Sequence, residues 1–297
     1  MKILKPFVLF CILLSSLMSF LALAASVNQA EKVVSDKTVI TIGIFPRRNA
    51  NVTEKLFKPL QKELSETLNR KVELTTTYDF ASFWENVSQQ KYDLVHYNQY
   101  HYIKSHKLFG YNVVAQNVEF NQERIASAIS VRKNSGINSL QDLKGKKIVF
   151  GGGRSAMVAY IATTYLLRQA GLKDGDYFEQ FALNPPKAVI ATYYRQAAAA
   201  GASNYILNLP QVKNKIKTHE MKYLAIGEKM ANLPWAIKAD LPDEVTQSIQ
   251  NFMLNLHTTD KGKAVLKSAR INRFIPATNA DYNPHRQIVE SVLGEDY

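Results

Sequence analysis

The chain has 297 residues, 46% of them hydrophobic and 21% charged, which is typical of a globular protein and excludes a disordered, collagen-like or disulfide-stapled one. Lys and Arg number 37 against 25 Asp and Glu, and the net charge of +12 suggests an anionic partner of unspecified kind. The length allows one large domain or two domains of roughly 130 residues each.

The N-terminus has the layout of an export signal. Two lysines precede an almost wholly apolar run over 7–23, and Ala22-Leu23-Ala24 has the small-x-small pattern of a cleavage site. We therefore predict a signal peptide over 1–24, with an uncleaved anchor as the alternative. The single cysteine, Cys11, lies in the apolar run, so cleavage would exclude disulfides, thiol catalysis and cysteine–metal sites from the mature chain.

Strands and helices are expected to alternate in the first third of the chain. Apolar or β-branched runs predict strands, and a four-residue apolar period predicts helices. The expected strands cover 39–44, 72–76 and 93–97. The expected helices run from a capping box at Asn51-x-x-Glu54 to residue 69, over 80–89 and over 100–108. This order indicates βαβ units and a parallel sheet covered on both faces.

The rest of the chain continues the alternation without an internal repeat. The expected strands are 124–131, 148–150, 178–183 and 223–226, with a strand end near 197–204. The expected helices follow Gly151-Gly152-Gly153, Pro185-Pro186 and Pro242, and a last one covers 284–292. No composition shift marks a linker between domains.

Several short motifs, taken in order, make the chain similar to one family. The run Ser-Leu-x-Asp-Leu-x-Gly-Lys over 139–146 resembles the start of the second lobe in type II periplasmic binding proteins. The segments 41–46, 58–60, 92–94 and 280–284 narrow the resemblance to the phosphate/phosphite/phosphonate-type (PhnD-like) solute-binding proteins of ABC importers. The resemblance covers roughly residues 38–293.

The resemblance implies an α/β fold of two lobes. Each lobe would be a mostly parallel sheet flanked by helices, and two crossing strands near 126–131 and 226–238 would join them. Lobe 1 would hold 38–128 plus 228–297, and lobe 2 would hold 129–227.

The implied function is that of a periplasmic receptor that is not an enzyme and needs no cofactor. It would capture a small oxyanion (phosphate, phosphite or phosphonate class) in the cleft between the lobes, act as a monomer, and deliver the ligand to an ABC permease in the inner membrane. Alternatives are a binding module that feeds a membrane sensor kinase, a receptor for a non-phosphorus anion, or an exported enzyme on the same scaffold.

The chain departs from the family pattern at turns close to the ligand. Only Ser155 matches a hydroxyl of the usual Ser-Thr-Ser-Gly turn, and Asn184-Pro185-Pro186 stands where Gly-Ser-His is common. Ala199-Ala200-Gly201 replaces a segment in which many relatives carry Asp. These departures disfavour recognition of a ligand ammonium.

Four turns are placed to form the site, because ligands bind outside the carboxyl ends of strands in an open α/β sheet. They cover 45–48, 96–99, 151–155 and 200–204, and helix starts after them would offer unpaired N–H groups to an anion. Each residue also has a plain structural interpretation, as a tight turn, a surface charge or a core aromatic. The candidate ligand-binding residues are Arg47, Tyr97, Asn98, Gly152, Gly153, Arg154, Ser155, Ser203 and Asn204.

Other chemistries find weaker support. His96, His101 and His106 are spaced by five, so they do not share a helix face, and we expect no metal site. No Gly-x-Ser-x-Gly turn nominates a serine hydrolase. The lysines over 213–217 lack interleaved aromatic residues, and we expect no nucleic-acid partner.

Overall fold

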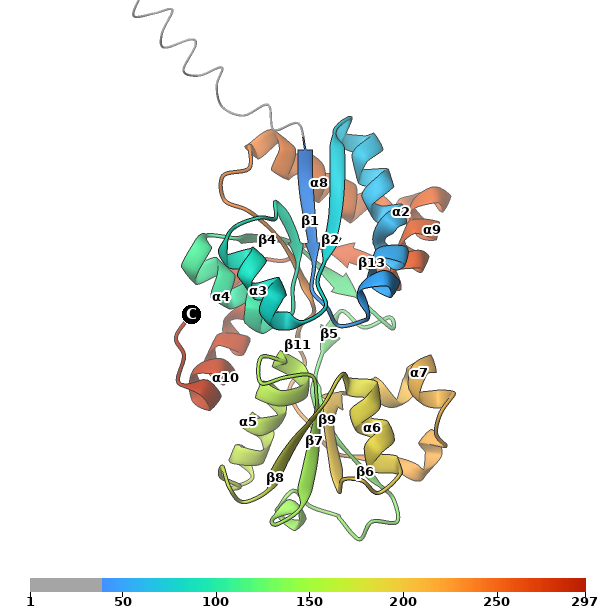
Figure 1. The fold of residues 1–297 in the computed structure, drawn as a ribbon, viewed down its shortest axis with the longest axis vertical. Helices are drawn as coiled ribbons and strands as arrows, with labels where there is room; N and C mark the ends of the chain where they lie inside the picture. The colour runs from blue at the N-terminus through green and yellow to red at the C-terminus, as the bar shows by residue number, and fades with distance from the viewer. Residues whose placement is uncertain (1–38) are drawn as a thin grey trace, which may run out of the picture. The chain divides into compact units, whose positions relative to one another are not determined.

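The computed structural model describes residues 39–297, and the predicted signal peptide over 1–24 lies outside them. These residues form two main sheets, each flanked by helices, and a two-stranded ribbon (Figure 1). The strand orders are β13-β4-β12-β3-β1-β2 in the six-stranded sheet and β10-β6-β9-β7-β8 in the five-stranded sheet. Within 39–297, no helix combines the length and apolar character needed to cross a membrane.

The six-stranded sheet combines strands from both ends of the described chain. Its strands are β1 (Val39–Ile44), β2 (Lys71–Thr76), β3 (Leu94–His96), β4 (Asn112–Val118), β12 (Pro234–Ile237) and β13 (Arg273–Ile275). Its helices are α2 (Ala50–Leu68), α3 (Phe80–Ser88), α4 (Gln99–Phe109), α8 (Asp243–Asn255) and α9 (Asp260–Ala269). Strand β1 pairs in parallel with β2 and β3, whereas β12 pairs antiparallel with β3 and β4.

Helix α2 differs from its prediction in start and in buried face. It begins at Ala50, and the side chain of its N-cap Asn49 accepts a hydrogen bond from the Asn51 amide, so the predicted capping box at Asn51 was wrong. Val52 is 45% exposed. A four-residue step turns a helix by about 40° more than one full revolution, so apolar residues that recur every four positions from Val52 drift off the buried face. The buried residues are Thr53, Phe57, Leu60 and Leu64.

The five-stranded sheet holds the middle of the chain. Its strands are β6 (Ser127–Arg132), β7 (Lys147–Gly151), β8 (Phe178–Ala182), β9 (Ala199–Ser203) and β10 (Met221–Ile226). Its helical segments are the π-helical turn η2 (Met157–Ile161), α5 (Ala162–Gln169), α6 (Pro185–Tyr193) and α7 (Pro210–Lys213). Strand β7 pairs in parallel with β8 and β9, and β6 pairs antiparallel with β9 and β10.

Both sheets are therefore mixed, which corrects the expectation of mostly parallel sheets. The parallel pairs come from the predicted βαβ units. Four antiparallel pairs involve β6 or β12, the first strand of each main sheet after the chain has crossed from the other, and a fifth joins β13 to β4.

The chain passes between the main sheets twice, and the two passages pair with each other. Strand β5 (Arg124–Ile125) pairs antiparallel with β11 (Met230–Ala231), and this ribbon lies between the main sheets (Figure 1). The predicted strand over 124–131 is thus divided into β5 and β6. The last helix, α10 (Asn283–Leu293), packs against α4 and α5, and Arg168 Nη1 donates to the Ser291 carbonyl at 2.8 Å.

Candidate functional site

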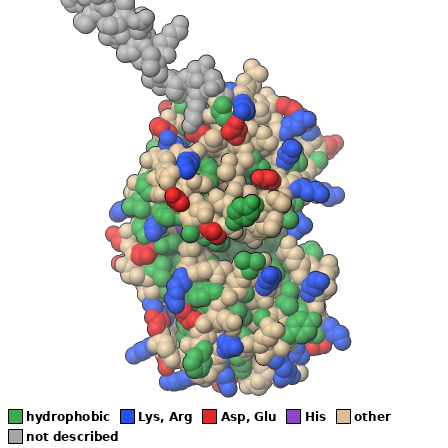
Figure 2. All heavy atoms as spheres, viewed as in Figure 1, with side chains coloured by type: hydrophobic (Ala, Val, Ile, Leu, Met, Phe, Trp, Pro, Cys, Tyr) green, Lys and Arg blue, Asp and Glu red, His purple; other side chains and the backbone are tan. Residues whose placement is uncertain are grey.

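A cavity of about 130 Å³ lies between the six- and five-stranded sheets. On the face drawn in Figure 2 the molecule is hollowed across its middle, and hydrophobic side chains gather there. From the first sheet and its connections, the lining residues are Phe45, Pro46, Arg47, Phe80, Asn98, Gln99, Ile125 and Leu233. From the second, they are Gly151, Gly152, Ala156, Met157, Val158, Ala159, Leu183, Asn184, Pro185, Ser203 and Tyr205.

The cavity lies at the carboxyl ends of strands, as expected for an open α/β fold. Phe45 follows β1 directly, Gly151 is the last residue of β7, and Ser203 is the last residue of β9. All four turns nominated from the sequence contribute at least one residue to the lining. The two sheets therefore present their strand ends to a common space.

Arg47 brings a positive charge to this space. Its Nη2 donates to Oε1 of Glu119 at 2.7 Å, and the two side chains are only 22% and 2% exposed. Burial acts to lower the pKa of Arg47, but the Glu119 carboxylate outweighs it and the pKa is raised. Within residues 39–297, Arg47 is the one charged side chain in the lining.

The neighbouring Arg48 shows that the local charge is unbalanced. Burial and then the charge of Arg47 lower the pKa of Arg48 from 12.5 to about 9. An arginine keeps its proton in proteins, so this shift indicates an unfavourable environment for the cation rather than a neutral side chain. Two guanidinium groups face one carboxylate, Glu119, and the net charge of this cluster is +1.

A buried polar network holds Glu119 in place. Asn117 Nδ2 donates to Glu119 Oε1 at 2.9 Å, and Asn117 Oδ1 accepts from Trp235 Nε1 at 2.8 Å. His96 stacks on Trp235 with ring centroids 4.5 Å apart, and its Nδ1 lies 3.2 Å from the Pro234 carbonyl oxygen. Burial, and then the charge of Arg47, lower the pKa of His96 well below its ordinary value, so this imidazole is neutral.

The N-terminus of α4 also faces the cavity. Its N-cap Asn98 accepts a hydrogen bond at Oδ1 from the His101 amide, 2.8 Å away. The amides of Gln99 and Tyr100, the first two of the helix, have no partner within a helix. They carry the partial positive charge of the helix start toward the lining residues Asn98 and Gln99.

Asn98 joins the two sides of the cavity as well. Its Nδ2 donates to the Ser155 carbonyl at 3.1 Å, and Ser155 belongs to the turn that follows β7. A single side chain thus caps α4 and contacts the opposite sheet's connection.

The opposite helix start, at α6, offers no comparable donors. Pro185 and Pro186 occupy its first two positions and have no N–H. The third amide, that of Lys187, donates to the N-cap Asn184 Oδ1 at 3.1 Å, and Ala188 N bonds to the Asn184 carbonyl at 3.2 Å. The prolines therefore give this side of the cavity an apolar surface instead of an anion-binding helix end.

Two glycines allow the β7 turn to approach α6 closely. A side chain on Gly151 would overlap the backbone of Pro185. Gly152 has a φ of +102°, which an L side chain rarely adopts, and its amide donates to the Ala182 carbonyl at 2.8 Å. The Gly-rich turn is thus required by local packing, and Gly152 also lines the cavity.

The nine candidate residues divide into two groups. Four of them line the cavity: Arg47, Asn98, Gly152 and Ser203. Five do not belong to its lining, and their contact with a ligand stays a prediction: Tyr97, Gly153, Arg154, Ser155 and Asn204.

Tyr97 and Arg154 have structural partners of their own. The Tyr97 side chain is fully buried among aromatic rings, including Phe83 and Tyr111. Arg154 is 68% exposed, pairs with Glu179 at 2.6 Å, and its guanidinium lies over the ring of Tyr160. These are the core-aromatic and surface-charge interpretations that the sequence left open.

Asn204 forms hydrogen bonds with residues on both sides of β5. Its Oδ1 accepts from the Ala126 amide at 3.2 Å, and its Nδ2 donates to Gln122 Oε1 at 3.2 Å. The adjacent Tyr205 lines the cavity and packs on Phe120, with ring centroids 4.6 Å apart.

Sequence reasoning missed the apolar part of the lining. The cavity wall also includes Phe80, Met157, Leu183 and Leu233. The sequence does not mark them, since an apolar residue gives the same signal in a core and in a cavity wall. Glu119 was missed as well, because 72 positions separate it from Arg47 and nothing local marks the pair.

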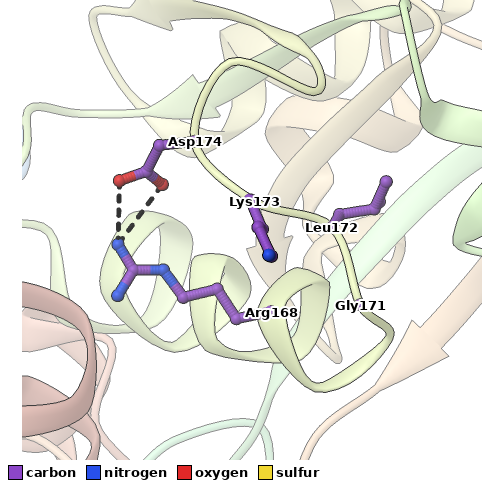
Figure 3. A pocket seen from close by; sticks show the side chains of 5 residues that line it. All are labelled: Arg168, Gly171, Leu172, Lys173 and Asp174. Carbon is purple, nitrogen blue, oxygen red and sulfur yellow. Dashed lines mark hydrogen bonds and ion pairs between the residues drawn. The ribbon is translucent and has the colours of Figure 1, made fainter.

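A second hollow lies on the surface near the end of α5. It is lined by Arg168, Gly171, Leu172, Lys173 and Asp174, and Arg168 pairs with Asp174 at 3.0 Å (Figure 3). Its two cations are accompanied by a carboxylate, and no strand end opens into it. Among residues 39–297, no three His, Cys, Asp or Glu side chains are grouped so as to hold a metal ion.

Comparison with known proteins identifies the family. Residues 42–282 match the family described as "ABC transporter, phosphonate, periplasmic substrate-binding protein". The chain belongs to this family. The resemblance noted in the sequence is thereby confirmed, and the protein is a periplasmic substrate-binding component of an ABC transporter and not an enzyme. Membership implies a small ligand and a membrane permease as partners.

Individual relatives agree with this assignment. The chain is 25% identical over 270 residues to the "Probable ABC transporter phosphite binding protein PhnD1" of Prochlorococcus marinus, covering 86% of this chain and 90% of that one. The structure of PhnD1 in complex with methylphosphonate has a TM-score of 0.76 at 20% identity, covering 87% and 99% of the two chains.

A binding protein component of an ABC phosphonate transporter from Pseudomonas aeruginosa has a TM-score of 0.74 at 17% identity and covers 87% of each chain. These likenesses confirm the two-lobe type II periplasmic binding fold.

Proposed function

We propose that this protein captures a phosphorus oxyanion, of the phosphate, phosphite or phosphonate class, in the cavity between its two sheets and delivers it to the permease. The observation that carries the proposal is the meeting of Arg47 and the α4 N-terminus at one otherwise uncharged cavity. Both favour a negative charge, and the Arg47–Arg48–Glu119 cluster retains a net charge of +1 that an anion would neutralise.

The donors available are enough for useful affinity. Hydrogen bonds to charged groups are each worth about 1.5–3 kcal/mol and neutral ones about 0.5–1.5 kcal/mol. Four to six such bonds, from Arg47, the first α4 amides, Asn98 and Ser203, would support binding in the micromolar range, about −8 kcal/mol. We propose Arg47, Asn98, Gly152 and Ser203 as the residues in contact with the anion.

The same proposal covers the organisation of the chain. Lobe 1 comprises 38–128 plus 228–297, lobe 2 comprises 129–227, and the ligand site lies between them. The protein acts as a monomer after removal of residues 1–24 and has no nucleic-acid partner. The pairing of β5 with β11 supports a hinge, because both chain passages run through that ribbon.

Calorimetric titration of the purified, ligand-free protein tests the proposal. Phosphate, phosphite and methylphosphonate are compared with sulfate, a sulfonate and a carboxylic acid. We expect at least one phosphorus oxyanion to bind in the micromolar range or tighter. Tighter binding of sulfate or of an organic acid would assign the site to a non-phosphorus anion, and no response to any anion would refute the proposal.

A matched pair of variants locates the site. Arg47→Lys keeps the charge beside Glu119 but loses the planar donor pair, and we expect about tenfold weaker binding. Arg154→Lys makes the same change in an exposed guanidinium outside the lining, and we expect unchanged affinity. A wild-type affinity in Arg47→Lys would remove Arg47 from the site.

A further inference from the structure

The walls of the cavity are more apolar than capture of an inorganic anion requires. Eleven of the nineteen lining residues are Phe, Pro, Ile, Leu, Met, Val or Ala. A phosphate or phosphite ion would be solvated best by donors on every side, since each of its oxygens accepts hydrogen bonds. Here the charge of Arg47 and the amides of the α4 start lie on one side of the space.

The five-stranded sheet supplies the apolar side. Within residues 39–297 its share of the lining contains no charged side chain, and it includes Met157, Val158, Leu183 and Pro185. The α6 helix start, which could have presented amides there, begins with two prolines and is capped by Asn184. An anionic group at Arg47 would therefore have apolar surface opposite it.

A ligand ammonium would find no free carboxylate in the lining. The carboxylate paired with the lining residue Arg47 is that of Glu119, which is buried and also accepts a hydrogen bond from Asn117. An ammonium group would have to displace Arg47 and would sit beside two guanidinium groups of like charge.

The size of the cavity suits a small ligand. Its volume of about 130 Å³ is close to that of the apolar protein cavity of about 150 Å³ that accepts benzene. A tetrahedral anionic head with a short carbon chain fits such a space.

From these observations, and resting on the function proposed above, we infer that the substrates are phosphonates with a short, uncharged, apolar substituent. The phosphonate head lies at Arg47 and the α4 N-terminus, and the substituent lies against Met157, Leu183 and Pro185. The protein selects for the carbon chain and against both inorganic phosphorus anions and aminoalkyl phosphonates.

A ligand series measures this preference directly. The ligand-free protein is titrated with phosphite, methyl-, ethyl- and propylphosphonate, and 2-aminoethylphosphonate. Each buried methylene should increase affinity about fourfold, or about fifteenfold from methyl to propyl. 2-Aminoethylphosphonate has the same chain length as propylphosphonate with an ammonium in place of the terminal methyl, and we expect it to bind at least tenfold more weakly.

Two exposed residues provide a matched pair of variants that leaves the core unchanged. Leu183 is 77% exposed and lines the cavity, whereas Phe178 is 67% exposed, lies on the adjoining strand β8 and does not line it. Leu183→Ser should weaken the binding of propylphosphonate more than that of methylphosphonate, and so lower the propyl-to-methyl affinity ratio at least threefold. Phe178→Ser should leave both affinities unchanged.

The outcomes separate this inference from the proposed function. Strongest binding of phosphite or of 2-aminoethylphosphonate would overturn the preference for an apolar substituent while leaving oxyanion capture intact. An unchanged propyl-to-methyl affinity ratio in Leu183→Ser would overturn the assignment of the apolar wall. Absence of binding across the whole series would overturn the proposed function and this inference together.

Discussion

Replacing Glu119 by Gln should destabilise the ligand-free protein while strengthening its binding of an anion. The substitution keeps the size of the side chain and one acceptor for Arg47 or Asn117, but it removes the negative charge. Arg47 and Arg48 then face each other without compensation. The two effects have opposite signs because an anion takes over the role of the missing carboxylate.

The structure allows the loss of stability in Glu119→Gln to be estimated. The Arg47–Glu119 pair joins atoms 2.7 Å apart, and the Glu119 side chain is 2% exposed. Removing one partner from a buried pair costs about 3–5 kcal/mol, and the partial exposure of Arg47 places this pair at the lower end, about 3 kcal/mol. For a chain of this size that corresponds to a decrease in Tm of roughly 6–12 °C.

Thermal unfolding and calorimetric titration of one preparation provide the assay. Without ligand, Glu119→Gln should have a lower Tm than the wild type. Saturating methylphosphonate should reduce this difference in Tm, and the Kd of the variant for methylphosphonate should be lower than that of the wild type. The control is Glu179→Gln, which makes the same change in the pair with the exposed Arg154 and should cost less than Glu119→Gln, about 1 kcal/mol. An unchanged Tm together with an unchanged Kd in Glu119→Gln would refute the account of charge at the site.

Three further substitutions have expected outcomes. Burial lowers the pKa of His101 from 6.5 to about 3, so the unfolded chain binds a proton below pH 6.5 that the native chain does not. The free energy of unfolding therefore decreases as the pH is lowered below 6.5. When the pH is lowered from 7 to 5.5, the free energy of unfolding of His101→Phe, measured in urea, should decrease by about 1 kcal/mol less than that of the wild type. Asn98→Ala loses the α4 cap and the bond to Ser155, which should lower the free energy of unfolding by about 1–3 kcal/mol in thermal unfolding. Gly201→Ala would overlap the Ala159 carbonyl and should cost about 1–3 kcal/mol in urea unfolding.

Each of these has a comparison that isolates its cause. His219→Phe changes an exposed histidine and should leave the pH dependence as it is. Asn184→Ala loses a cap without a bond across the cavity, and a loss equal to that of Asn98→Ala would contradict the contribution of the bond to Ser155. Gly153 has open space where a side chain would lie, so a Gly153→Ala loss as large as that of Gly201→Ala would contradict the packing argument.

The regular part of the fold follows from local patterns. Strand β1 has the bounds that its β-branched run predicts, α3 ends one residue earlier than predicted, and β3 is one residue shorter at each end. Strand β4 was not predicted, because Gln116 and Asn117 interrupt its apolar run. Both are buried and bonded to distant groups, Gln116 to the Asn232 amide and Asn117 to the Trp235 indole. A strand whose polar residues are satisfied by tertiary contacts has no local signature.

The site was predictable in position and only partly in composition. Strand ends converge in this fold class, so the four turns could be nominated from the order of elements alone. Which residues of a turn face the cavity depends on the local backbone of that turn. In the turn after β7, Gly152 lines the cavity whereas Arg154 lies on the surface. The partner of Arg47 could not be found from the sequence, since the pair forms only when the fold brings the turn after β1 close to the residue that follows β4.

A crystal structure of the protein grown with methylphosphonate would show where the anion binds. We expect the ligand in the cavity between the two sheets, with its oxygens within hydrogen-bonding distance of Arg47 and of the first amides of α4, and with its methyl group toward Met157 and Leu183. A ligand bound instead at the surface hollow near Arg168, or a cavity that stays empty at saturating ligand, would refute capture of the anion between the sheets.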